Sequence, residues 1–297
     1  CGARLQPQAR TFDRAAVARL LDRLDAGCRV TPETFGCYYS LADALLDGDL
    51  ARATAEFAAL SSLPVPAGDR IVVPLRPPER CARSRRYLDL LTGEGDGAPI
   101  LPVDAQIAAS FAGRFERGLT LMREAAPELA GEVDAMVHEV VTIAGDPAAN
   151  MQVDGGSHYQ LWGALFLNAS FHQTDAAMFE VIAHESAHSL LFGLCRDEML
   201  VDNDDEPRYR SPLRSDLRPM SGIYHATFVS ARMHWSMSRL LASGVAPVDS
   251  HGAILAARDD DLRNFNAGLA VIDAHARLTT LGRELMDGAR HYMASVQ

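Results

Sequence analysis

The sequence predicts a mostly α (α+β) fold, in which a large helical domain includes a small sheet or a single strand. Three observations support this class. The 297 residues are 48% hydrophobic and 23% charged, a composition typical of globular proteins. Apolar residues recur at helical spacing along most of the chain, and one short uninterrupted apolar run has the character of a strand.

The elements divide the chain into three parts. Residues 1–62 form an N-terminal helical region, because apolar side chains follow helical spacing from Thr11 to Leu24 and a second helix is expected over Ser40 to Leu60. Residues 63–102 are rich in proline and glycine and are expected to form a linker or a long loop. Residues 103–297 form the third part, which carries the chemical motif described below. All three could also belong to one continuous domain.

The charge balance limits the partners of the protein. The formal net charge is -11, and the chain contains no lysine, so every fixed positive charge is an arginine. A protein that binds nucleic acid through its phosphates usually presents a basic surface, so we expect no nucleic-acid partner. A small anion held by one or two arginines is compatible with this balance.

The cysteines and the hydropathy pattern bear on the compartment. No stretch approaches the ~18 apolar residues of a membrane-spanning helix, which predicts a soluble protein without a membrane partner. The five cysteines are odd in number and form no CxxC pair, so a reducing cytoplasm is the simplest expectation. The alternative, suggested by Cys1, is a processed lipoprotein whose signal has been removed.

One predicted helix carries the motif with chemical content. It is expected to begin at Thr174 or Asp175 and to end near Phe192, with Gly193 placed to terminate it. It contains HESAH, an HExxH motif formed by His184, Glu185 and His188. Positions i and i+4 lie on one face of a helix, so both imidazoles can reach one metal ion, and Glu185 can orient a metal-bound water. We therefore expect a zincin-like metal-binding helix.

A third metal ligand should follow downstream, and two kinds of residue could supply it. Glu198, Asp202 and Glu206 would complete a site of two histidines and one carboxylate, but they lie in an acidic run with the character of a surface loop. His225 lies just inside a helix expected to begin near residues 221–222 and would enter the core with that helix. We therefore predict that His225 completes the site.

Several segments together resemble a known family. These are HESAH, the segment YRSPLR at residues 209–214, Arg218-Pro219, the segment SGIYH at residues 221–225, and the strand GALFLN at residues 163–168. They are similar to the HExxH-type peptide β-hydroxylases, iron- and 2-oxoglutarate-dependent enzymes of ribosomal peptide natural-product biosynthesis. The resemblance covers roughly residues 130 to 245, with a weaker similarity at 278–286.

The resemblance implies a ligand set and a catalytic residue. His184, His188 and His225 would hold iron(II), and Glu185 would be a catalytic residue beside them. Iron sites that use 2-oxoglutarate usually have two histidines and one carboxylate, so an alternative set exchanges one histidine for Glu185 or for an acid of the 198–206 loop.

The residue types also suit the chemistry that the resemblance implies. Three protein ligands on an octahedral iron leave two positions for a chelating keto acid and one for dioxygen, whereas tetrahedral zinc keeps one open position. The remote carboxylate of 2-oxoglutarate needs a cation, and we expect Arg218 or Arg214 to supply a bidentate guanidinium. The strand Gly163 to Asn168 could offer an exposed edge along which a peptide is held, or it could be an internal strand.

The leading hypothesis is a 2-oxoglutarate-dependent dioxygenase that uses iron(II) to hydroxylate the β carbon of a peptide. The expected partner is a precursor peptide in ribosomal peptide natural-product maturation. The alternative is an HExxH zinc metallopeptidase in which Glu185 is the general base and Glu206 is the third ligand. A third class is a non-catalytic peptide-binding protein with a structural metal.

Overall fold

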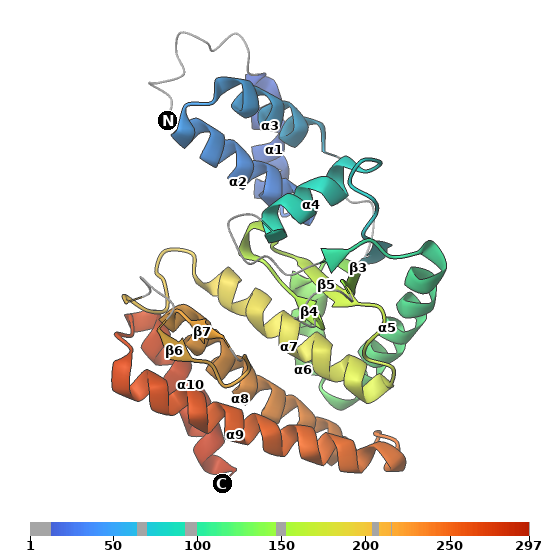
Figure 1. The fold of residues 1–297 in the computed structure, drawn as a ribbon, viewed down its shortest axis with the longest axis vertical. Coiled ribbons are helices and arrows are strands. Elements are labelled where there is room, and N and C mark those ends of the chain that lie inside the picture. The colour runs from blue at the N-terminus through green and yellow to red at the C-terminus, as the bar shows by residue number, and fades with distance from the viewer. Residues whose placement is uncertain are drawn as a thin grey trace.

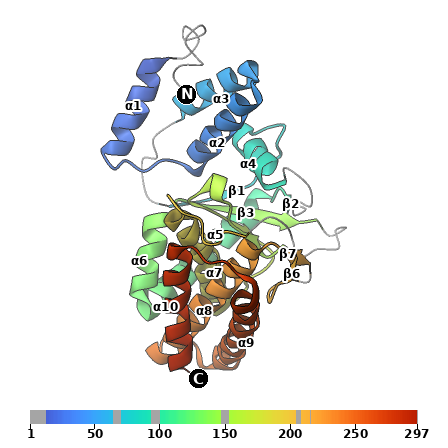
Figure 2. The ribbon, with the colours of Figure 1, turned by 90° about the vertical axis from the view of Figure 1, so that its left-hand side faces the viewer.

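The computed structural model describes residues 13–63, 70–92, 100–146, 153–203, 208–214 and 216–296. Helices dominate, as the sequence predicts, and they surround a small mixed sheet (Figures 1 and 2). The α-helices are α1 (Arg14–Asp25), α2 (Pro32–Asp47), α3 (Leu50–Ser62), α4 (Ala82–Thr92), α5 (Ala105–Ala125), α6 (Pro127–Met136), α7 (Asp175–Leu194), α8 (Met220–Ser243), α9 (His251–His275) and α10 (Thr280–Ser295). The strands and short 3-10 helices are β1 (Ile71–Pro74), β2 (Ile100–Leu101), β3 (Glu139–Gly145), β4 (Gly155–Gly156), η2 (Tyr159–Leu161), β5 (Ala164–Asn168), β6 (Tyr209–Arg210), β7 (Leu217–Arg218) and η3 (Val248–Ser250).

The main sheet has the order β1-β3-β5-β4. Strands β1, β3 and β5 are parallel, whereas β4 joins the edge of β5 in the antiparallel sense and β2 pairs with the end of β3. Alternate residues of the central strands face opposite sides, because successive side chains of a strand point in opposite directions. Val140, Leu165 and Leu167 pack against helices α5 to α7, whereas Val141 and Phe166 pack against Tyr87 of α4.

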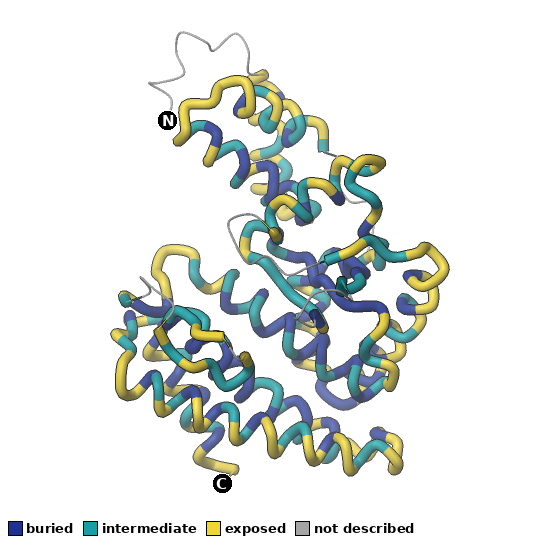
Figure 3. The backbone as a smooth tube through the Cα atoms, viewed as in Figure 1, coloured by how far each residue is buried: buried dark blue, intermediate teal, exposed yellow. Residues whose placement is uncertain are grey.

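The core is concentrated around the sheet and α7. Figure 3 shows the deepest burial in the strands and in the long helices next to them, while α1 buries only Ala16. Helices α8 and α9 pack against each other along their length, and α10 contacts α8 beside them. A second apolar cluster fills the space among α8, α9 and α10 and includes Leu191 of α7. Helix α7 therefore lies between two cores and is held on several sides.

Two N-terminal expectations differ from the structure. The helix expected over Ser40 to Leu60 is two helices, because Gly48 adopts a left-handed conformation with φ 75° and ends α2. Asp49 then begins α3 by accepting a hydrogen bond from the backbone N–H of Arg52. The stretch 63–102, expected as a linker or long loop, contributes β1 and β2 to the sheet and also forms α4.

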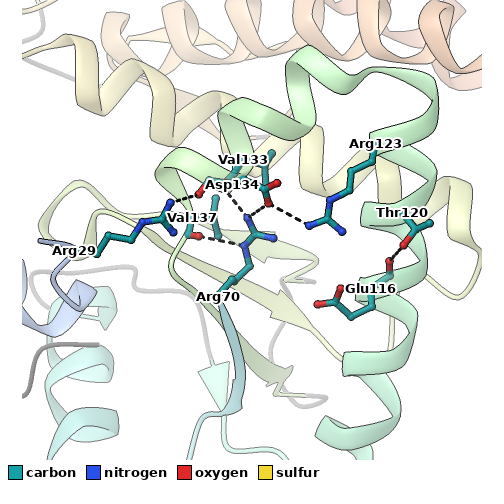
Figure 4. Close-up of polar contacts among 8 residues, drawn as sticks. All are labelled: Arg29, Arg70, Glu116, Thr120, Arg123, Val133, Asp134 and Val137. Carbon is teal, nitrogen blue, oxygen red and sulfur yellow. Dashed lines mark hydrogen bonds and ion pairs between the residues drawn. The ribbon is translucent and has the colours of Figure 1, made fainter. Parts of the chain in front are cut away.

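Arginines join the N-terminal segments to the main body at the end of α6 (Figure 4). Arg70, just before β1, donates hydrogen bonds to the carbonyl oxygens of Val133 and Val137 and to the carboxylate of Asp134. Arg29, between α1 and α2, donates to the carbonyl oxygen of Asp134. Cations are favourable at a helix C-terminus, where carbonyl groups lack partners within the helix. These contacts fix the start of β1 and anchor the N-terminal helices.

Among the described residues, no helix combines the length and the apolar character needed to cross a membrane.

Candidate metal centre

Helix α7 positions the HExxH motif. The helix begins where the sequence predicts. The side chain of Thr174 stabilises this start by accepting a hydrogen bond from the backbone N–H of Ala177. The helix continues to Leu194, so Gly193 does not end it. Apolar residues before and after the motif are buried, which keeps the helix inside the protein. His184 and His188 share one face, with ring centroids 5.1 Å apart.

Helix α8 brings His225 to the same place. This helix begins at Met220, directly after the β6–β7 hairpin and Pro219, close to the start that the sequence predicts. The Nδ1 atoms of His188 and His225 lie 3.1 Å apart, and the two rings are stacked with centroids 5.3 Å apart. The structure therefore brings together the three histidines that the sequence suggests as ligands.

The separation of these two nitrogen atoms fits a shared metal ion. Two nitrogens that each lie about 2.1 Å from one ion, at right angles, are about 3.0 Å apart. His184 is arranged differently, because its Nδ1 lies 3.1 Å from the sulfur of Met233. Within the described residues, no three His, Cys, Asp or Glu side chains converge on one point. The donor set fits a metal in its chemistry, and His188 and His225 fit it in their spacing.

The protonation state of the histidines also suits a metal. Burial lowers the pKa of His184 to about 4. Burial, together with the two neighbouring histidines, lowers the pKa of His188 well below its usual range. Both imidazoles are therefore neutral near pH 7, which is the state that binds a metal.

Glu185 is a buried carboxylate beside the histidines. Only 4% of the residue is exposed, and its Oε1 lies 4.0 Å from Nε2 of His184. Its Oε2 has no hydrogen-bond partner among the described residues. Burial raises the pKa of Glu185 to about 8; the nearby Ser157 hydroxyl partly offsets this rise, and the charge of Asp154 adds to it. A buried oxygen without a partner is costly, so this carboxylate is suited to receive a proton or a ligand from the cavity.

The three histidines and Glu185 face a cavity of about 720 Å³. Arg214 and Arg218, from the β6–β7 hairpin region, line the same cavity. Asp216 lies between them, 3.2 Å from Nε of Arg214 and 3.1 Å from Nη1 of Arg218. Although partial burial acts to raise it, hydrogen bonds from both arginines set the pKa of Asp216 below its usual value.

A glycine lets Arg218 approach α8 closely. A Cβ atom at Gly222 would lie 3.2 Å from Cβ and 3.5 Å from Nε of Arg218. The arginine side chain therefore runs along the first turn of α8, just before His225 in the sequence. Both predicted arginines thus belong to the cavity wall that also carries the metal-ligand candidates.

The carboxylates of the acidic segment occupy other positions. Glu198 accepts hydrogen bonds from the backbone N–H groups of Thr280 and Leu281, so it caps the N-terminus of α10. Asp202 is joined through its backbone to Arg277, and neither acid lines the cavity. Glu206 lies outside the described residues.

Of the two possibilities that the sequence leaves open for Gly163 to Asn168, the structure shows the internal strand and not the exposed edge. Strand β5 pairs with β3 on one side and with β4 on the other, and all of its residues are buried. The outer strand on this side is β4, and both of its glycines line the cavity. A Cβ at Gly155 would lie 3.0 Å from Oε1 of Glu185, so glycine permits the close approach of β4 to α7.

Sequence reasoning missed several residues that line the cavity. Glu180 lies one turn before His184, and partial burial raises the pKa of its carboxyl. The i, i+4 spacing from His184 was a signal that could have revealed it. His172 has a φ of 55°, rare for a residue other than glycine, and its Nε2 lies 3.2 Å from the carbonyl oxygen of Asp154. No pattern in the sequence pointed to His172, Asp154 or Met233.

Comparison with known proteins gives no further assignment: no family model matches the chain, and a search of curated proteins finds no significant match.

Proposed function

We propose that this protein is an iron(II)- and 2-oxoglutarate-dependent oxygenase that hydroxylates a side-chain β carbon of a peptide in ribosomal peptide natural-product maturation. One observation carries the proposal. Three imidazoles from α7 and α8 face the same cavity as two arginines from the preceding hairpin. A simple hydrolytic metal site does not need such arginines, whereas a keto diacid does, because its remote carboxylate requires a cation.

His184, His188 and His225 would hold the metal, which when bound supplies the activation of dioxygen coupled to oxidation of the keto acid. The protein's own contribution is to bind and to orient. The neutral imidazoles are ready to coordinate without losing a proton, because burial keeps the pKa values of His184 and His188 low.

Arg218 would bind the remote carboxylate of 2-oxoglutarate. Its Nη1 pairs with Asp216, and no other carboxylate of the described residues forms an ion pair with its guanidinium. Asp216 neutralises one of the two positive charges at this end of the cavity. Arg214, Arg218 and Asp216 together therefore leave a net charge of about +1, which complements one additional carboxylate.

The peptide would be held along β4. This strand ends the main sheet, and its outer edge has no pairing partner among the described residues. An extended peptide can form main-chain hydrogen bonds to such an edge. Both residues of β4 line the cavity that the metal-ligand candidates face, so a peptide on this edge would lie beside that cavity.

The proposal is tested by reconstitution under anaerobic conditions followed by exposure to oxygen. With iron(II), 2-oxoglutarate and oxygen, we expect succinate to form, and a cognate peptide should gain the mass of one oxygen atom with its backbone intact. Cleavage of the peptide into two fragments without any requirement for 2-oxoglutarate would contradict the proposal.

One observation favours a zinc metallopeptidase as the second candidate. Glu185 is buried beside His184, a position from which its carboxylate could accept a proton from a metal-bound water. The same position of Glu185 is compatible with an oxygenase, so this residue does not separate the two chemistries. A substitution of Arg218 separates the two chemistries, because 2-oxoglutarate binding should depend on this arginine and zinc-dependent peptide cleavage should not.

A further inference from the structure

Aromatic side chains form a continuous path from the cavity to the N-terminal helices. Phe192 of α7 lines the cavity, and its ring lies 5.3 Å from that of His225. On its other side, Phe192 lies 6.4 Å from Tyr159 at the start of η2. Tyr159 lies 5.4 Å from Tyr39 of α2, and Tyr39 lies 5.4 Å from Tyr38. We refer to Phe192, Tyr159, Tyr39 and Tyr38 as the aromatic strip.

The strip is accessible at its outer end. Tyr38 is 57% exposed and Tyr159 is 48% exposed, whereas Tyr39 and Phe192 are partly buried between their neighbours. Large aromatic rings left on a surface are typical of binding sites, because they bury much area and lose little side-chain entropy. Tyr39 forms edge-to-face contacts with both Tyr38 and Tyr159, an arrangement that aromatic pairs favour.

The strip is also continuous with the chain that forms the edge of the sheet. Residues 155–157 line the cavity, and His158 and Tyr159 follow them directly in the sequence. The His158 ring stacks on that of Tyr159, with centroids 5.0 Å apart. A peptide that follows the edge of β4 out of the cavity therefore arrives at Tyr159. Helix α2 packs against η2, which places Tyr39 and Tyr38 next along this route.

We infer that the aromatic strip is a second binding surface for the peptide substrate, which leaves the cavity past Phe192 and Tyr159 and places an apolar or aromatic side chain on Tyr39 and Tyr38. This inference rests on the proposed function, in that the occupant of the cavity is a peptide. The N-terminal helices then have a role in substrate recognition. An amino acid or a dipeptide bound in the cavity would not reach Tyr39 and Tyr38.

The length of the strip indicates how much of the substrate it can contact. The three ring separations from Phe192 to Tyr38 total about 17 Å, so the strip spans at most this distance, which about five residues of extended chain cover at roughly 3.3 Å per residue. A peptide with about five residues on one side of the residue in the cavity should therefore contact the whole strip.

The test uses twelve-residue peptides selected from a random library on the full chain, with dissociation constants measured by fluorescence anisotropy. We expect Tyr38→Ala and Tyr159→Ala each to weaken binding at least five-fold and Tyr38→Phe to restore it. Leu46→Ala is the matched control, because Leu46 is an apolar residue of the same helix that is 86% exposed and lies outside the strip. Shortening a selected peptide to four residues should also weaken binding.

Equal affinity of the selected peptides for wild type and Tyr38→Ala, or failure to select any peptide, would overturn the inference. So would a dimer that dissociates on Tyr38→Ala in sedimentation velocity, because the strip would then be an interface between copies of this chain. Succinate formation is measured separately. Loss of peptide affinity in the variants supports the strip even if the wild type makes no succinate, in which case only the oxygenase proposal fails.

Discussion

At the scale of single residues, the cavity is defined by polar groups that burial would normally disfavour. Glu185 and His188 lie inside the protein, and Glu185 keeps one oxygen without a partner among the described residues. Such groups are retained where they serve a site, because each lowers stability unless something binds to it. The HExxH spacing made His184, Glu185 and His188 predictable, because the i, i+4 rule is local. His225 was expected at the site from its place at the start of a helix and from the family resemblance of the segment that contains it.

Arg218→Ala should weaken 2-oxoglutarate binding while leaving iron binding nearly unchanged. Loss of a charge-assisted pair at a partly exposed guanidinium should cost about 1.5 to 3 kcal/mol, roughly a ten-fold to hundred-fold rise in the dissociation constant. Anaerobic calorimetric titration of the iron-loaded protein with 2-oxoglutarate measures this dissociation constant. Arg210→Ala is the matched control, because Arg210 belongs to the same hairpin but does not line the cavity. An unchanged 2-oxoglutarate dissociation constant for Arg218→Ala would contradict this role of Arg218 and assign the binding of the remote carboxylate to Arg214.

Asp261 of α9 should make stability depend on pH. It is 2% exposed, and one carboxylate oxygen has no partner among the described residues. Burial, with a contribution from Glu180, raises the pKa of Asp261 to about 8. The folded state therefore holds a proton that the unfolded state releases near pH 4, so stability is lost as the pH rises from about 4 to 8.

Asp261→Asn should remove this loss. We expect the free energy of unfolding of the variant to exceed that of the wild type by about 2 to 5 kcal/mol at pH 9. At pH 4 the two free energies should differ little. Urea denaturation across this pH range measures the difference, and Asp259→Asn, at an exposed residue of the same helix, serves as the control. Parallel pH profiles for wild type and Asp261→Asn would contradict the expectation.

At the scale of elements, helix ends were predictable where a local signal exists. Thr174 has the side chain of a typical N-cap, and α7 begins directly after it. The break at Gly48 was missed because apolar spacing continues on both sides of it, although Gly48-Asp49 carries the signals for a helix end and a helix start. Strand β4 could not be predicted, because two glycines have no hydrophobic alternation. Without β4, nothing local indicated that β5 is internal.

Glu198→Ala should destabilise the protein without changing the metal site. The substitution removes two hydrogen bonds to the first turn of α10 and a negative charge near its N-terminus, so we expect a loss of about 1 to 2 kcal/mol. Thermal unfolding measures this loss, and iron titration should give an unchanged affinity. Asp197→Ala is the control, because the Asp197 side chain is 85% exposed and, among the described residues, pairs with the neighbouring Arg196. A large fall in iron affinity for Glu198→Ala would instead identify Glu198 as a ligand.

At the scale of the whole molecule, long-range contacts decide what the sequence could not show. Segment 63–102 has the composition of a linker, yet β1 pairs with β3 in parallel and Arg70 is fixed at the end of α6 (Figure 4). Parallel pairing joins residues far apart in sequence, so local patterns do not reveal it. For the same reason, the aromatic strip that joins α2 to the cavity could be recognised only from the structure.

Arg70→Ala should lower the stability of the whole molecule by about 2 to 4 kcal/mol. The Arg70 side chain is only 8% exposed, and its loss removes the guanidinium donor from the carbonyl groups of Val133 and Val137 and from the carboxylate of Asp134. Arg123→Ala removes a half-exposed ion pair to the same Asp134 and should cost less than about 0.5 kcal/mol. Urea denaturation compares the two variants, and equal losses would show that burial of Arg70 contributes nothing.

The most direct test of the central claim is an anaerobic visible spectrum of the protein with iron(II) and 2-oxoglutarate. If His184, His188 and His225 hold the iron and Arg218 binds the co-substrate, a metal-to-ligand band should develop only when both are present. The band should be absent in His225→Ala, and in Arg218→Ala it should need more 2-oxoglutarate. A protein that shows no band, binds zinc and cleaves peptides in a reaction that depends on Glu185 would contradict the account.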